Sequence, residues 1–168
     1  MPTAVEVLRK TLAGEDDNSV VISAVGMTTN MRDLIQSQGD DFSPLNGHDL
    51  VQKKVKSIVW MDGNYNFGCA QHDSDNWLGD DKDCRGSARD AVAGWPASVP
   101  QYYNSPDLGS AVNSGGALSR CAPISNPCRK AYEDWWGQPN HDRSAWDLIN
   151  TLVAVRGSSN SHLKEVPW

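Results

Sequence analysis

The residues best suited to chemistry follow a short apolar run near the middle of the chain. Residues 58–61 (Ile-Val-Trp-Met) form this run, and Asp62-Gly63 end it. An apolar run of this length that a glycine ends predicts a strand buried on both faces. The segment that follows is rich in Asn, Asp, His and Trp, which is typical of a binding loop, although a long polar surface loop has the same composition. Because ligands collect at the carboxyl ends of strands in an open α/β sheet, this strand end is a candidate site.

Four cysteines fall as two close pairs, Cys69 with Cys84 and Cys121 with Cys128. The even number and the short loops favour two disulfides, and with them an extracellular or secretory location. Two alternatives stay open. Zinc could bind Cys69, His72 and Cys84, but no second C-x-x-C or H-x-x-x-H pair completes such a site. The thiols could also be free and buried.

One further acidic residue, Asp147, falls in the first turn of a helix predicted over residues 144–155, with Ser144 as its cap. A carboxylate at this position interacts favourably with the helix dipole, by ~0.3–1 kcal/mol. That interaction alone could explain Asp147, so its position is compatible with a structural and with a functional role.

Helices and strands alternate along the rest of the chain. Hydrophobic periodicity and turn residues predict helices over 3–13, 31–36, 50–55, 85–94, 127–136 and 144–155, and strands over 19–25, 57–61 and 99–103. Thr3 and Glu6 form a capping-box pair at the start of the first helix, and Thr29 and Asn30 suit capping of the second. This alternation is typical of an α/β fold with an open, mainly parallel sheet and flanking helices. At 168 residues, the chain (1–168) is expected to form one domain.

Charge and hydropathy exclude two classes of partner. The formal net charge is −6, which argues against the clustered Lys and Arg that nucleic-acid binding needs, so we expect no binding to nucleic acid. The sequence contains no run of ~20 apolar residues that could span a membrane, so we expect no membrane insertion.

With these segments in order, the chain resembles the inosine–uridine-preferring nucleoside hydrolase family. Residues 20–30 look like that family's strand ending in a Gly-x-x-Thr-Asn turn. Residues 58–63 look like its apolar strand ending in Met-Gly-Gly. Residues 144–149, together with 154–157, look like its carboxyl-side helix, which begins with an Asp. The resemblance spans roughly residues 3–157, with gaps.

The resemblance implies a nucleoside hydrolase-like α/β fold and hydrolysis of the N-glycosidic bond of ribonucleosides. In that family a calcium ion at the carboxyl edge of the sheet binds the attacking water and the ribose hydroxyls, and calcium takes 6–8 oxygen ligands. Asp147 matches the family's carboxyl-side calcium ligand. The strand end near Trp60 matches the place where a backbone carbonyl reaches the metal. Trp146 stands where many members have a catalytic His, so no residue is assigned to protonate the leaving group.

The same resemblance implies that a nucleoside or sugar contacts the loop after residue 61. The passage nearest to the family's ribose-binding Glu-x-Asn motif is Asp75-Asn76, although its order differs. Asp75 and Asn76, with Asn64 and Asn66, are therefore the candidate substrate-binding residues. Each asparagine could instead cap a loop.

The family supplies most of its calcium ligands from an Asp-rich cluster after a first strand, which would lie upstream of Met1. Asp16 and Asp17 precede a strand instead of ending one, so they do not replace that cluster. We therefore expect an incomplete domain, truncated at the amino end, with the carboxyl end as a second candidate truncation. The alternative is a catalytically inactive, disulfide-pinned module that binds a sugar or nucleoside. A second copy of the chain stays open as a further partner.

Overall fold

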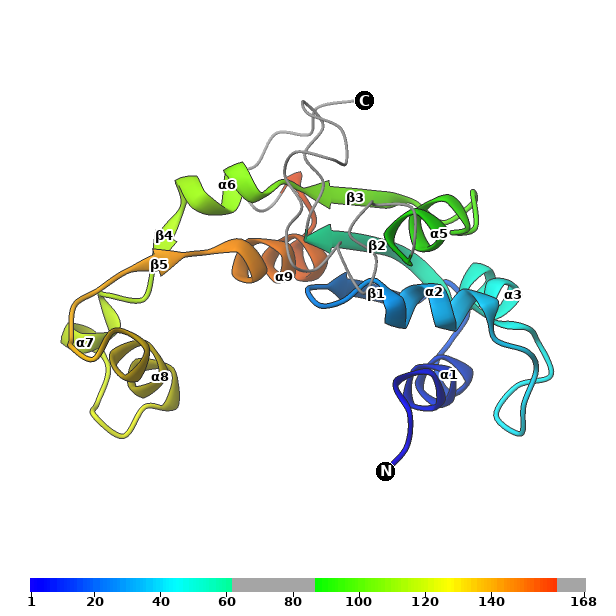
Figure 1. The fold of residues 1–168 in the computed structure, drawn as a ribbon, viewed down its shortest axis with the longest axis horizontal. Coiled ribbons are helices and arrows are strands. Elements are labelled where there is room, and N and C mark those ends of the chain that lie inside the picture. Colours follow the sequence, from blue (N-terminus) through cyan, green and yellow to red (C-terminus); the bar gives the residue numbers. More distant parts are fainter. Residues whose placement is uncertain (62–86, 160–168) are drawn as a thin grey trace.

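A three-stranded parallel sheet forms the centre of the protein (Figure 1). The computed structural model describes residues 1–61 and 87–159. Strands β1 (Val20–Ala24), β2 (Val55–Met61) and β3 (Gln101–Asn104) lie side by side in the order β1-β2-β3, and both pairings are parallel. The prediction of an α/β fold with a parallel sheet and flanking helices is confirmed at this level.

The amino-terminal helices and α5 cover one face of the sheet. They are α1 (Ala4–Gly14), α2 (Thr29–Gln36), α3 (Gly47–Lys54) and α5 (Ser87–Ala93). The core between these helices and β2 consists of Leu12, Met31, Leu34, Ile35, Leu50, Val51, Val55, Ile58, Trp60, Ala91, Trp95 and Val99. Burying a large apolar side chain stabilises a fold by about 1.5–3 kcal/mol, so this layer supplies the main apolar stabilisation.

Helix α9 (Trp146–Arg156) covers the opposite face and contacts all three strands. Side chains alternate between the faces of a strand, so Val59 and Met61 lie on the α9 side while Ile58 and Trp60 belong to the other core. The protein is thus a helix–sheet–helix arrangement, with α9 as the single helix of its layer among the described residues.

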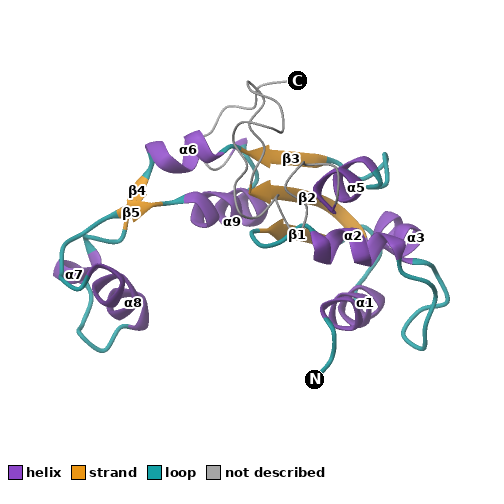
Figure 2. Ribbon diagram, viewed as in Figure 1, coloured by secondary structure: helices purple, strands orange, loops and turns teal. Residues whose placement is uncertain are grey.

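Residues 113–144, which we call the arm, stand apart from this sheet (Figures 1 and 2). Helix α6 (Pro106–Ala111) leads into the arm. The arm contains β4 (Asn113–Ser114), α7 (Leu118–Cys121), α8 (Pro127–Trp136) and β5 (Arg143–Ser144). Strands β4 and β5 pair antiparallel and form its base. Neither α7 nor α8 contains a buried residue, so the arm has no core of its own.

The ends of two helices test the predicted caps. The capping box is confirmed: the Thr3 hydroxyl accepts from the Glu6 backbone N–H at 3.2 Å, and the Glu6 carboxylate accepts from the Thr3 N–H at 2.6 Å. The prediction that Ser144 caps the last helix is wrong. Ala145 is the N-cap of α9 and makes no side-chain cap, because Ser144 pairs with Asn113 in the β4–β5 ribbon.

The start of α2 also differs from the prediction. Thr28 is the N-cap and makes no side-chain capping bond, while Thr29 and Asn30 lie inside the first turn of the helix. Strand β1 ends at Ala24 and residues 25–27 follow it, so the chain can enter the helix at Thr29, two residues before the predicted start at residue 31. Among the described residues, no helix combines the length and the apolar character needed to cross a bilayer.

Candidate functional site

The carboxyl ends of β2 and β3 meet the amino end of α9. Asn104, the last residue of β3, lies opposite Met61, the last residue of β2. The Asn104 amide Nδ2 donates to the backbone carbonyl of Trp146 at 3.3 Å. Since Asp147 is the next residue, the structure brings this predicted ligand to the carboxyl edge of the sheet, where the strand end near Trp60 also lies.

A second asparagine fixes α9 one turn further along. The Asn150 side chain is fully buried, and its Nδ2 donates to the Val59 carbonyl and to the Ser23 hydroxyl, both at 2.9 Å. These two bonds tie α9 to β2 and to β1. The position of Asp147 relative to the strand ends is therefore set by hydrogen bonds as well as by apolar packing.

The Asp147 carboxylate stands at the surface. Within the part of the chain that the structure describes, no hydrogen bond or ion pair engages it. Desolvation by the surrounding protein raises the pKa of Asp147, and the positive charge of Arg143 lowers it in part. A carboxylate whose desolvation is only partly offset by a nearby positive charge is available to a cation or to the hydroxyl groups of a ligand.

The side chain of Trp60 is buried on the side of the sheet that faces the amino-terminal helices. Its side chain is 1% exposed and packs edge-on against Trp95, with ring centroids 5.6 Å apart. Its indole Nε1 donates to Gln101 Oε1 at 3.0 Å. The indole is therefore part of the core, and the proposed contact of this strand end with a ligand through a main-chain carbonyl stays a prediction.

Trp146 cannot replace the histidine that the family resemblance places there. Its indole Nε1 donates to the Pro106 carbonyl at 3.0 Å and to the Ser110 hydroxyl at 3.2 Å. An indole N–H is a hydrogen-bond donor that does not release its proton near neutral pH, and here it is engaged with α6. Trp146 holds α6 against α9 and offers no proton to a leaving group.

The other predicted site residues divide into two groups. Asn64, Asn66, Asp75 and Asn76 lie outside the described residues, as do Cys69, His72 and Cys84 with their alternatives of a disulfide or zinc. Cys121 and Cys128 are described.

The expected disulfide between Cys121 and Cys128 is not present in the structure. Both residues are free thiols, and both are exposed, so the alternative of buried thiols does not describe them either. Cys121 ends α7 and Cys128 lies in the first turn of α8. The two thiols belong to separate helices that face solvent, so the arm is not pinned by this pair.

The described residues do not make a complete calcium site. Over residues 1–61 and 87–159, no group of three or more His, Cys, Asp and Glu side chains could hold a metal ion. Calcium takes 6–8 oxygen ligands, and Asp147 offers one carboxylate. The donor set seen here therefore falls short of that ion's requirement.

Asn104 and Asn150 are the positions that the sequence analysis missed. Their Oδ1 atoms are buried and have no hydrogen-bond partner. An unpaired buried acceptor costs about 1–3 kcal/mol, and the hydrogen bonds that the amide Nδ2 atoms donate offset part of this cost. The one available signal was their placement, Asn104 at a strand end and Asn150 beside apolar Ile149 on the inner side of a helix.

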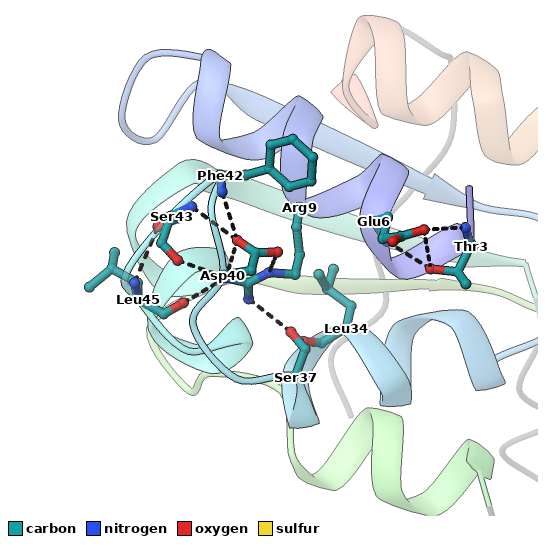
Figure 3. Close-up of polar contacts among 9 residues, drawn as sticks. All are labelled: Thr3, Glu6, Arg9, Leu34, Ser37, Asp40, Phe42, Ser43 and Leu45. Atoms are coloured by element: carbon teal, nitrogen blue, oxygen red, sulfur yellow. Dashed lines mark hydrogen bonds and ion pairs between the residues drawn. The ribbon is translucent and has the colours of Figure 1, made fainter. Parts of the chain in front are cut away.

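A different polar cluster lies near the opposite edge of the sheet (Figure 3). The Arg9 guanidinium, from α1, is 2% exposed and donates to both oxygens of Asp40, at 2.6 and 3.1 Å. It also donates to Ser37 Oγ and to the carbonyls of Ser43 and Leu45, at 2.9, 3.1 and 2.8 Å. Its hydrogen bonds hold the loop between α2 and α3 in one conformation.

No protein-family model, curated protein or solved structure matches this chain. The geometry at the carboxyl edge of the sheet is therefore the basis on which a function can be proposed.

Proposed function

We propose that this chain is part of a nucleoside hydrolase-like protein that hydrolyses the N-glycosidic bond of ribonucleosides. The observation that carries this assignment is the Asp147 carboxylate, which has no hydrogen-bond or ion-pair partner among the described residues and lies at the carboxyl edge of a parallel sheet, beside the ends of β2 and β3. This is where open α/β sheets bind their ligands. The order of the three sequence segments that resemble the family supports the same assignment.

The reaction needs two kinds of group at this edge. Water attacks C1′ of the ribose while the bond to the base breaks, so a carboxylate must accept the water proton and stabilise an oxocarbenium-like sugar. Asp147 can accept hydrogen bonds from ribose hydroxyls or a proton from water. The leaving base needs a proton in turn, and Trp146 does not supply one. Because the described donors do not complete a calcium site, we assign no step to that ion.

A second candidate is a module that binds a sugar or nucleoside without turnover. The observation that favours it is that the described residues supply one carboxylate at the edge and no acid for the leaving group. A carboxylate held at a strand end can still recognise vicinal hydroxyls, so binding requires less of the site than catalysis does.

Calcium titration of the purified chain by calorimetry, with and without ribose, tests the assignment. Saturable calcium binding that Asp147→Asn abolishes and that Asp16→Asn, an exposed control before β1, leaves unchanged would support the assignment. Such binding would need oxygen ligands in addition to the one described carboxylate. Calcium binding that Asp147→Asn leaves unchanged would contradict the role of Asp147 on which the assignment rests. Without calcium binding, saturable binding of inosine or uridine that is lost in Asp147→Asn would favour the binding module.

Turnover is expected to be undetectable for residues 1–168 alone, because one matching carboxylate does not make a hydrolytic centre. Ribose release from inosine and uridine measures this directly. Release that exceeds the rate of the Asp147→Asn variant would overturn the expectation and would show that further catalytic groups lie in the chain.

A further inference from the structure

A pocket of about 290 Å³ opens at the amino edge of the sheet, away from Asp147. It is lined by Ala13, Phe42, Ser43, Pro44, Leu45, Leu50, Lys53 and Lys54. Lys53 and Lys54 end α3 immediately before β2 begins, and β2 runs for seven residues to the carboxyl edge. At about 3.3 Å per residue, the two edges are ~20 Å apart. This pocket is thus separate from the candidate site around Asp147.

We propose that this pocket is a small-molecule site for a ligand with a compact aromatic body and a single carboxylate. The volume is at the lower end of ordinary ligand pockets, which are about 300–1,000 Å³, so it suits a ligand of one ring. The chemistry of the lining and the rigidity of one wall lead to this class of ligand.

Five of the residues that line the pocket are apolar. Ala13 comes from the end of α1, Leu50 from α3, and Pro44 and Leu45 from the loop between α2 and α3. Phe42, on the same loop, leaves 45% of its surface exposed. An exposed phenyl ring beside an apolar hollow can bury its face against a ligand ring, with the offset or edge-on geometry that aromatic pairs prefer.

The loop that carries this wall is held in place before any ligand arrives. Asp40 Oδ1 accepts from the backbone N–H groups of Phe42 and Ser43, at 3.1 and 3.0 Å. The buried Arg9 guanidinium bonds Asp40 and the carbonyls of Ser43 and Leu45 (Figure 3). Three of the eight lining residues, 42, 43 and 45, are thereby fixed through their backbones. A preorganised wall lowers the ordering cost of binding.

The charge of the ligand follows from the two lysines. The ammonium group of Lys54 already has two partners. Its Nζ lies 2.8 Å from Asp17 Oδ1 and donates to the Glu15 carbonyl at 2.7 Å. Lys53 makes a longer contact, 3.8 Å to Asp17 Oδ2, and its side chain is 51% exposed. One loosely held ammonium group beside an apolar hollow matches one carboxylate, whereas a dianion such as phosphate would need a second cation.

Chemical-shift mapping with phenylacetate as the probe tests this assignment, with phenylacetamide as its uncharged analogue and acetate as the analogue without a ring. We expect phenylacetate to shift the backbone amide resonances of residues 42, 43, 45 and 50–54 in a saturable way. Acetate is expected to leave them in place. Shifts that fail to saturate, or that map away from the pocket, would overturn the assignment.

Two substitutions and a matched control separate the charge from the ring. Lys53→Gln is expected to weaken phenylacetate binding by about two- to fivefold, as for an exposed ion pair, and to leave phenylacetamide unchanged. Phe42→Ala removes ring contact but keeps the backbone bond to Asp40, so it should weaken both probes. Lys56→Gln, an exposed lysine outside the lining, should weaken neither. Equal phenylacetate affinity in Lys53→Gln and the unsubstituted chain would refute the role of Lys53.

This test is independent of the proposed hydrolase site. Because Asp147 does not line the pocket, Asp147→Asn should bind phenylacetate with unchanged affinity, whether or not the hydrolase proposal holds.

Discussion

Arg9 and Asp40 are an ion pair in which the two partners have very different environments. The Arg9 side chain is 2% exposed, whereas that of Asp40 is 30% exposed. Taking a guanidinium out of water is costly unless its donors are satisfied, and here they bond a carboxylate, a hydroxyl and two carbonyls. The side chain that the sequence places on the apolar face of α1, four residues after Val5, is thus the polar centre of the neighbouring loop.

The acid dependence of stability should report this pair. Hydrogen bonding from Arg9, above all, lowers the pKa of Asp40 from its ordinary 3.8 to about 2. A carboxyl with a depressed folded-state pKa contributes stability above its ordinary pKa and loses that contribution as the pH falls through the depressed value. We expect the thermal midpoint of the protein to drop between about pH 4 and pH 2, and Asp40→Asn to flatten this part of the profile while lowering the midpoint at pH 7.

Asp41→Asn is the matched control for that measurement, since Asp41 is the adjacent, exposed carboxyl. An identical acid profile in Asp40→Asn and Asp41→Asn would show that the Arg9 pair does not dominate this pH range.

The contribution of Asp147 to stability should depend on pH in the opposite direction from that of Asp40. Its pKa is raised, chiefly by desolvation, so the folded state binds its proton more tightly than the unfolded chain does. Stability is then lost as the pH rises from the ordinary Asp pKa through the raised one. Asp147→Asn is therefore expected to raise the thermal midpoint at pH 7 and to have little effect below pH 4. A lower midpoint at pH 7 would mean that the carboxylate has a stabilising partner in the folded chain.

Among the elements, α9 is the one whose placement depends most on polar contacts. It packs on the sheet through Ile149, and Asn150 reaches past the helix surface to bond Val59 and Ser23. Its outer side carries Leu148, which is 53% exposed. A helix that is apolar on both sides is not oriented by hydrophobicity alone, so the asparagine bonds select which side faces the sheet.

The substitution Asn150→Ala measures how much the Asn150 hydrogen bonds stabilise the packing of α9 on the sheet. It removes two hydrogen bonds, each of about 0.5–1.5 kcal/mol, so we expect the free energy of unfolding in urea to fall by about 1–3 kcal/mol. Val155→Ala, near the end of α9 and 77% exposed, is the control and should lower it by no more than about 0.5 kcal/mol. Equal losses in the two variants would show that α9 is held by apolar packing without the Asn150 bonds.

The elements also show where sequence reasoning reaches its limit. The span of α8 was predicted at both ends, because Pro127 opens it and Gly137, at φ 69°, closes it by local chemistry. Strand β2 could be predicted because a buried parallel strand has a continuous apolar sequence, and β1 is similarly apolar over residues 20–22. Strand β3, with the sequence Gln-Tyr-Tyr-Asn, lacks such a run. Strands β4 and β5 were missed, since a pairing of two residues each leaves no periodicity. Their pairing then moved the cap of α9 from Ser144 to Ala145.

The candidate site, too, could be predicted from the sequence only in part. Asp147 could be placed in a first helical turn from its neighbours, because helix starts are local. The contact between the start of α9 and the end of β3 could not be predicted. Asn104 and Trp146 are 42 residues apart, and neither segment carries a sequence pattern that indicates their pairing. The buried amides of Asn104 and Asn150 are invisible to periodicity, which reads apolar residues and treats a polar one as a gap.

At the scale of the whole molecule, the arm and the sheet layer are joined through Arg143. Its guanidinium lies 4.1 Å from the ring centroid of Trp135, on α8, and 5.6 Å from that of Trp146, on α9. Trp135 is nevertheless 64% exposed, so one stacked cation covers a small part of its surface. The attachment of the arm is correspondingly modest.

Arg143→Ala is expected to release the arm without unfolding the sheet. An exposed cation–π contact contributes about 0.5–1 kcal/mol, so chymotrypsin should cleave within residues 113–144 faster, while the urea midpoint of the main transition changes little. Arg32→Ala, a surface arginine on α2 paired with Asp33, is the control and should leave the cleavage rate unchanged. Unchanged cleavage in Arg143→Ala would show that the β4–β5 ribbon alone holds the arm.

The bond between Ser23 and Asn150 joins residues 127 positions apart, and this separation matters during synthesis on the ribosome. Strand β1 leaves the ribosome early, whereas the helix that covers one of its faces leaves last among the described elements. At about 5–20 residues per second, the nascent strand waits on the order of ten seconds with that face open to solvent and to chaperones. We therefore expect the yield of folded protein in a cell-free system to depend on chaperones that hold nascent chains, more strongly than the modest size of the chain would require.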